Sequence, residues 1–311
     1  MKRAFIVMFT ITLIFAVPIS TLFIVSNSIF QNYYEKKEEE SISTLLAMYN
    51  FETNQIVANI KQNLTILSQD PTITGGNKSD CNETLSKFVS QNPQYANAAL
   101  LLPDGTPYCG AVISDVPTFT ETGDPYFENA IKTRTYTVGD YRIGRLSFKP
   151  LVPFGYPVYK SNGNLVGVLT IGLDINWLGN YYQSFPTIPG ISIALLDQNG
   201  AILKAVQSID FVIPSDVTKE ILAYGTPGIV PDEISDTQSG RDFLYIKLTD
   251  LENNPLSIVI SYEKSQTQPV FTDFIQSNFI AVIIAIIALM AIITPFVPKT
   301  IKKLNKYVNP N

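Results

Sequence analysis

The chain has 311 residues and a net charge of −5; hydrophobic residues make up 46% of it and charged residues only 16%. Because about a quarter of the residues in soluble domains are charged, part of this apolar content is expected to lie in lipid. The chain contains no histidine. Nucleophiles activated by histidine, histidine metal sites and histidine autophosphorylation within this chain are therefore excluded.

Each end of the chain carries an apolar run without charge. The first run extends from Ala4 to Phe30 and the second from Phe279 to Val297. About 20 apolar residues cross a bilayer, so we expect transmembrane helices over 4–30 and 277–297. A cleaved signal peptide is the alternative for the first run. That run is longer than the roughly 7–15 apolar residues of a signal peptide, and no clear cleavage site follows it.

Basic residues flank the two runs on the sides of the chain ends. Lys2 and Arg3 precede the first run, and four lysines follow the second: Lys299, Lys302, Lys303 and Lys306. Short basic flanks stay in the cytoplasm, so we expect residues 1–3 and 298–311 inside and residues 31–278 outside. The other 16 basic residues and all 27 acidic residues lie between the runs, which gives that segment a net charge of −11. Such an acidic outer segment argues against a nucleic-acid partner.

The two cysteines, Cys81 and Cys109, both lie in the predicted outer segment. Outside the cytoplasm such a pair is usually a disulfide. The alternative, two free thiols in a metal site, lacks any further Cys or His in the sequence. We therefore predict a disulfide, no metal site and no cofactor.

A long stalk helix is predicted over residues 31–69, continuing from the first apolar run. Apolar side chains recur there at a spacing of three or four residues, and the acidic residues fall on other faces. Pro71 and the pair Gly75-Gly76 are expected to end the helix. The apolar stripe either packs against the domain's own sheets or forms a coiled contact in a homodimer, and one surface can do both in different turns.

Two strand-rich modules are predicted after the stalk, over residues 70–183 and 184–276. In the first, we expect helices over 125–133 and 174–182, and strands over 98–102, 135–141, 148–159 and 165–173. Asn162-Gly163 is a hairpin signal between the last two strands. The order of elements then repeats, because Ala194–Gly200 is similar in sequence to Ala99–Gly105. Strands are expected over 241–248 and 256–262.

The first module carries a series of short motifs. In chain order they are Tyr126-Phe127-Glu128-Asn129-Ala130, Val138-Gly139-Asp140-Tyr141, Lys149-Pro150, Tyr156-Pro157-Val158, Gly163, Gly167-Val168-Leu169 and Leu173-Asp174-Ile175. They resemble the Cache sensor domain. Over about residues 31–270 the chain is similar to the double Cache form, an α+β fold with a long N-terminal helix and two PAS-like antiparallel-sheet modules between two transmembrane helices. The resemblance implies an extracytoplasmic receptor for a small metabolite that transmits binding across the membrane.

The chain departs from the family pattern in two places. Amino-acid-binding members carry an Arg-x-Trp-Tyr element where this chain has Asp124-Pro125-Tyr126-Phe127. An acid thus replaces the arginine that would clamp a carboxylate, which favours an amine or a neutral metabolite as ligand. In addition, only about 14 residues follow the second apolar run. We therefore expect signalling through a partner.

The predicted ligand site lies in the first module and combines aromatic surface with acceptors for an amine. Its residues are Tyr126, Tyr136, Asp140, Tyr141, Tyr156 and Asp174. By family position, Asp174 matches the acid that meets a ligand's amino group, but an N-cap of the following helix fits equally well. Asp140 could instead sit in a turn, and the tyrosines could belong to the core.

Enzyme signatures are missing from the sequence: it has no glycine-rich phosphate loop, no G-x-S-x-G elbow and no metal-ligand cluster. A membrane-anchored small-molecule sensor that is not an enzyme is therefore the first functional hypothesis. A non-sensing membrane or surface protein that reuses the Cache fold is the alternative, and an extracytoplasmic enzyme ranks below both.

Overall fold

The computed structural model of the chain describes residues 2–112, 119–186, 190–207, 234–236, 241–247 and 255–263. One compact unit is Ile42–Glu263; the other consists of Met1–Ser41 and Lys264–Asn311. No helix among the described residues is both long enough and apolar enough to cross a membrane. The predicted span over 277–297 and the basic tail over 298–311 lie outside the described residues.

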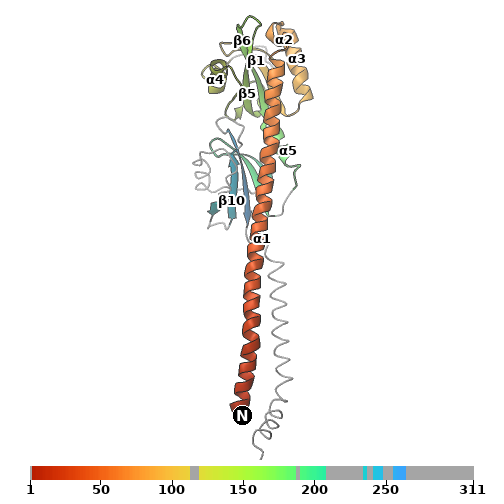
Figure 1. Cartoon of the computed structure of the whole chain (residues 1–311). Helices are drawn as coiled ribbons and strands as arrows, with labels where there is room; N and C mark the ends of the chain where they lie inside the picture. Colours follow the sequence, from red (N-terminus) through yellow and green to blue (C-terminus); the bar gives the residue numbers. More distant parts are fainter. Residues whose placement is uncertain are drawn as a thin grey trace, which may run out of the picture. The chain divides into compact units, whose positions relative to one another are not determined.

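Helix α1 runs from Lys2 to Leu67 and contains the helix that the sequence predicts over 31–69 (Figure 1). From residue 42 onward, its apolar stripe is buried at Ile42, Leu46, Tyr49, Val57, Ile60 and Leu64. Positions three and four apart share one helix face, so this stripe is the face that packs on the rest of the unit. The internal-packing alternative is therefore confirmed.

The end of α1 follows from Asp70 and Pro71. The carboxylate of Asp70 accepts a hydrogen bond from the backbone N–H of Thr72 at 2.8 Å and so caps α2, Pro71–Thr74. Proline lacks a backbone N–H and restricts the residue before it, so α1 ends before Pro71 and a new helical turn starts there.

The first sheet is antiparallel, with the strand order β2-β1-β6-β5-β3, and β4 pairs with β5. Its strands are β1 Tyr95–Leu101, β2 Pro107–Gly110, β3 Thr137–Val138, β4 Arg142–Ile143, β5 Pro150–Tyr159 and β6 Leu165–Asp174. Three more helices accompany it: α3 Lys78–Gln91, α4 Pro125–Thr133 and α5 Ile175–Tyr182. The predicted hairpin of β5 and β6 is present, and Gly163 in its turn has a φ of +85°.

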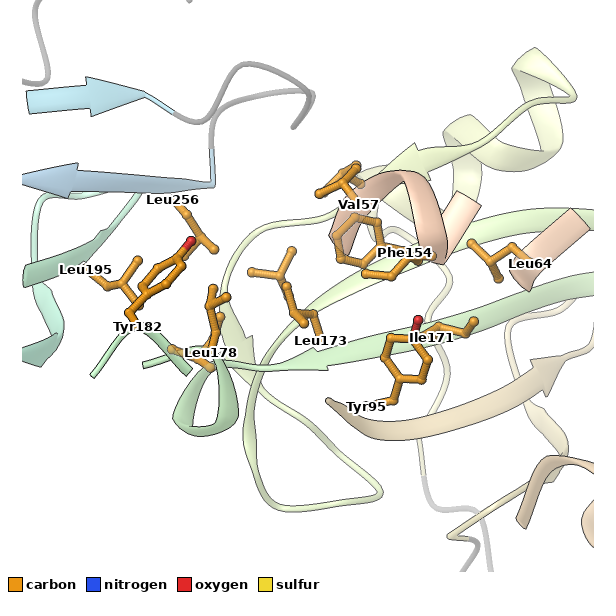
Figure 2. Packing of buried hydrophobic residues seen from close by; sticks show 14 of the residues in the cluster. Val57, Leu64, Tyr95, Phe154, Ile171, Leu173, Leu178, Tyr182, Leu195 and Leu256 are labelled. Atoms are coloured by element: carbon orange, nitrogen blue, oxygen red, sulfur yellow. The ribbon is translucent and has the colours of Figure 1, made fainter. Parts of the chain in front are cut away.

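The two faces of this sheet have different partners because side chains alternate along each strand. Ile171 of β6 and Phe154 of β5 lie on the face that packs against α1, where Figure 2 shows them near Leu64 and Val57. On the opposite face, Val168 of β6 packs with α4 in a separate small cluster. In Figure 1, α4 accordingly lies across the sheet from α1.

The second sheet has the order β8-β7-β11-β10-β9, which repeats the connectivity of the first. Its strands are β7 Ile191–Asp197, β8 Ile202–Gln207, β9 Ile234–Asp236, β10 Arg241–Lys247 and β11 Leu256–Glu263. Helix α5 joins the two sheets in one core: Figure 2 shows its Leu178 and Tyr182 beside Leu195 of β7 and Leu256 of β11.

The structure differs from the predicted elements in several places, among them strands β8 and β9, which no expected element covers. Of the strand expected over 135–141, only the two residues of β3 form a strand, and β4 begins after that range. Helix α3, capped by Asn77, was not predicted because few of its residues are apolar. Strand β2 was also missed. The predicted disulfide between Cys81 of α3 and Cys109 of β2 is confirmed, with the Cα atoms 5.9 Å apart.

Candidate ligand-binding site

A cavity of about 60 Å³ opens on the face of the first sheet that is turned away from α1. At roughly 10–15 Å³ per water, it would hold about four to six waters. Its floor consists of alternate residues of three central strands: Asn97 and Ala99 of β1, Leu151 and Pro153 of β5, and Thr170 and Gly172 of β6. Small side chains at Ala99 and Gly172 leave this space free.

The walls of the cavity come from α4, from β4 and from two loops. Tyr126 of α4 lines it, together with Glu121 from the preceding loop, Arg142 of β4 and Arg145 from the turn after β4. Tyr126 is buried, and its carbonyl oxygen accepts a hydrogen bond from the hydroxyl of Thr137 at 2.7 Å. The guanidinium carbon of Arg142 lies 5.1 Å from the centre of the Tyr126 ring.

The charged groups around the cavity form a connected set. Nη1 and Nη2 of Arg142 both donate to the carboxylate of Asp124, Nη2 at 3.0 Å. Nη1 of Arg142 also lies 3.3 Å from Glu121, and Nη1 of Arg145 lies 3.6 Å from the other oxygen of Glu121. Burial raises the pKa of Glu121 and the two arginines oppose that shift. The cavity thus presents charges of both signs beside an aromatic ring.

Asp124 has a role that its position in the motif does not reveal. It occupies the N-cap position of α4, yet its side chain makes no capping hydrogen bond. The carboxylate turns to Arg142 instead. Arg142 of β4 thereby compensates the negative charge of Asp124. Sequence reasoning missed Arg142, Arg145 and Glu121, because their pairing joins residues that are distant in the chain.

Of the six predicted site residues, only Tyr126 lines the cavity. Tyr136, Tyr141 and Tyr156 are half-buried and pack against the core that contains α1. The ring of Tyr136 lies 5.8 Å from that of Phe154, on the other side of the sheet from the cavity floor. Asp140 is exposed between β3 and β4, and its carbonyl oxygen accepts from Nε of Arg142 at 3.5 Å.

Asp174 is the N-cap of α5, as one of the two sequence interpretations predicts. Its Oδ1 accepts hydrogen bonds from the backbone N–H groups of Asn176 at 2.9 Å and Trp177 at 3.2 Å. Its Oδ2 lies 3.3 Å from the ammonium of Lys149. Asp174 follows Gly172 on the same face of β6 without lining the cavity, and ligand contact by Asp174 stays a prediction. Within the described part of the chain, no group of three His, Cys, Asp or Glu residues is placed to hold a metal ion.

The sequence matches no family model and is not significantly similar to any curated protein. Its fold is similar to those of solved receptor domains. An extracellular ligand-binding receptor from Desulfohalobium retbaense aligns with a TM-score of 0.57 and 14% identity over 70% of this chain and 39% of that chain. The ligand-binding domain of the Campylobacter jejuni chemoreceptor Tlp3, solved with L-valine, aligns with a TM-score of 0.52 and 14% identity over 75% and 95%.

A third solved structure is the ligand-binding domain of the Pseudomonas aeruginosa amino acid chemoreceptor PctC in complex with GABA. It aligns with a TM-score of 0.51 and 14% identity over 73% of this chain and 99% of that domain. At such identities the likeness is one of fold. The chain shares its fold with these extracellular ligand-binding domains, which agrees with the sensor-domain resemblance that its sequence indicates.

Proposed function

We propose that this protein is a membrane-anchored extracytoplasmic receptor of the double Cache form that binds a small molecule in the cavity of its first sheet. The observation that carries the proposal is the cavity itself: Arg142, Arg145, Glu121 and Tyr126 meet on the sheet face away from α1. A few polar groups that converge beside apolar ones are typical of a ligand site. The two sheets with the same strand order support two modules of one type.

The anchoring rests on the sequence. Residues 4–30 and 277–297 are the proposed spans, both termini are cytoplasmic, and residues 31–278 are outside. The side chains of Val25, Ile29 and Tyr33 are 55%, 64% and 60% exposed along α1. They recur every four residues and so lie on one helix face. That exposed apolar face supports contact with lipid or with α1 of a second copy, which agrees with a homodimer through the stalk.

A net-neutral ligand is favoured over a simple amine. The amine preference depended on Asp124, Asp140 and Asp174, but Asp124 pairs with Arg142 and Asp174 with Lys149. Arg145, which is partly exposed, and the buried Glu121 lie 3.6 Å apart, so the charges around the cavity balance one another. A small solute with both a donor and an acceptor end would match them. L-valine and GABA, bound by Tlp3 and PctC, each carry an amino group and a carboxylate.

Transmission of the signal would start at the sheet. The strands that form the cavity floor present their alternate residues to α1, so a ligand on one face can displace the packing on the other. From there, α1 leads back to Lys2. The proposed partner is a cytoplasmic signalling protein that responds to this displacement of α1.

A thermal-shift screen of the full-length chain tests the proposal, using amino acids, amines, organic acids and neutral metabolites. A ligand at 100 times its Kd should stabilise the fold by about 2.7 kcal/mol and raise Tm. Arg145→Gln should abolish that shift. The control Arg134→Gln, which changes an exposed arginine at the end of α4, should retain it. Absence of any stabilising solute, or a shift that survives Arg145→Gln, would contradict the proposed site.

A further inference from the structure

A second and larger cavity of about 230 Å³ lies between α1 and α5. Helix α1 contributes Glu52, Gln55 and Asn59 to it, and α5 contributes Trp177 and Tyr181. It is separate from the cavity of the first sheet, with which it shares no lining residue. None of the functions proposed above accounts for it.

One wall of this second cavity is aromatic. Trp177 and Tyr181 lie one turn apart on α5, and their rings stack with centroids 5.2 Å apart and planes inclined by 6°. The hydroxyl of Tyr181 donates a hydrogen bond to Oε2 of Glu52 at 2.8 Å. That bond also raises the pKa of the phenol. The carboxylate of Glu52 is thereby fixed at the edge of the aromatic surface, and the phenol of Tyr181 stays neutral.

The charge at this cavity is negative and uncompensated. Its lining contains no lysine or arginine. Among the described residues, Glu52 has no ion-pair partner, unlike Glu121, Asp124 and Asp174. The other polar groups are neutral amides, such as that of Asn59. An anion would meet no cation here, so the electrostatics favour a positive ligand.

We propose that this cavity is a second ligand site, which takes a small organic cation of the methylated ammonium class. Such cations bind to the faces and edges of Trp and Tyr rings by cation–π attraction, and a nearby carboxylate adds charge complementarity. Methyl groups also suit the apolar surface of Ile56, which completes the wall on α1. A bound cation would bridge α1 and α5 and stabilise their contact.

The sequence offers a direct measurement, because Trp177 is the only tryptophan in the chain. Its fluorescence therefore reports on this cavity alone. The full-length chain is titrated with tetramethylammonium chloride, and sodium chloride at equal concentration serves as the reference. We expect a saturable change in Trp177 emission with tetramethylammonium and none with sodium, together with a matching binding heat by calorimetry.

Variants then assign the site. Glu52→Gln keeps the size of the side chain and removes its charge, and it should weaken binding by about tenfold or more. Trp177→Ala should abolish the calorimetric heat. The control Glu83→Gln, which removes an exposed carboxylate on α3, should bind as the parent chain does. Melting curves of each variant show whether it is folded.

Three results would overturn the inference. The first is a response to tetramethylammonium that does not saturate or that equals the response to sodium. The second is unchanged affinity in folded Glu52→Gln. The third is displacement of tetramethylammonium by a neutral sugar that binds the parent chain and Glu52→Gln equally well, which would assign the cavity to an uncharged ligand.

Discussion

Ion pairs change which acidic residues of the sequence motifs are available to a ligand. Asp124 and Asp174 both stand at helix N-caps within family motifs, and both lie against a cation, Arg142 and Lys149 respectively. Neither pairing is visible in the sequence, because the partners lie on other strands and loops. Tyr126, one of the predicted ligand contacts, lines the first cavity from the buried face of α4. The charged lining was not.

Asp174→Ala should lower the free energy of unfolding by about 1 kcal/mol, because it removes the acceptor for two backbone N–H groups at the start of α5. Asp174→Asn is the matched variant. Asparagine caps as well as aspartate, and the lost ion pair involves a lysine side chain that is 54% exposed, so its contribution is small. Urea unfolding of the parent chain, Asp174→Ala and Asp174→Asn measures the two contributions. Equal destabilisation by Asn and Ala would show that the charge of Asp174, and not its capping hydrogen bonds, stabilises the fold.

The buried Glu121 should make stability depend on pH. Its pKa in the folded chain is raised above the ordinary value of 4.5, chiefly by burial. A raised carboxyl pKa contributes stability that is fully present below the unfolded pKa and is lost as the pH rises through the folded pKa. The stability of the parent chain relative to Glu121→Gln should therefore fall as the pH is raised from about 4 to neutral. Denaturation at several pH values measures this.

Glu83→Gln is the control for that measurement, because Glu83 is exposed on α3. Its stability should run parallel to that of the parent chain across the same pH range. If instead the parent chain becomes more stable than Glu121→Gln as the pH rises, Arg142 and Arg145 outweigh the burial of the carboxylate.

At the scale of the elements, hydrophobic period and turn chemistry predicted most of what the structure contains. The stripe on α1, the hairpin at Asn162-Gly163 and the restart at Ala194–Gly200 all lead to observed elements. Short or polar elements were missed for physical reasons. Strand β4 has only two residues, and α3 buries only Cys81 and Leu85, so neither carries a recognisable period.

Two glycines of the β5–β6 hairpin should differ strongly when replaced by alanine. A Cβ at Gly167 would lie 2.0 Å from the carbonyl oxygen of Leu101, which is backbone and cannot move aside. Gly163 has a φ of +85° but open space around it. We expect Gly163→Ala to cost about 1 kcal/mol and Gly167→Ala at least ~2 kcal/mol, because the second change forces β1 and β6 apart. Urea unfolding compares them, and a smaller loss in Gly167→Ala would show that this close approach is not required.

At the scale of the molecule, one core joins α1, both sheets and α5 within the unit Ile42–Glu263. The sequence predicts the repeat and much of the order of elements along the chain, but not the pairing of β1 with β6 or of β7 with β11, which joins strands that are far apart in the chain. It does not predict the two cavities. Each of them depends on side chains that converge from three or more elements, and such convergence is set by the packing of the whole unit.

The arrangement of the chain relative to the membrane is the last prediction. Basic flanks at both ends and an acidic segment between the apolar runs predict that both termini lie inside and residues 31–278 outside. Both cysteines are joined in a disulfide, so an introduced cysteine would be the only free thiol. With a membrane-impermeant maleimide on intact cells, Ser90→Cys on the exposed face of α3 should be labelled. Asn305→Cys in the basic tail should be labelled only after the cells are permeabilised. Labelling of Asn305→Cys in intact cells, or protection of Ser90→Cys, would contradict this topology.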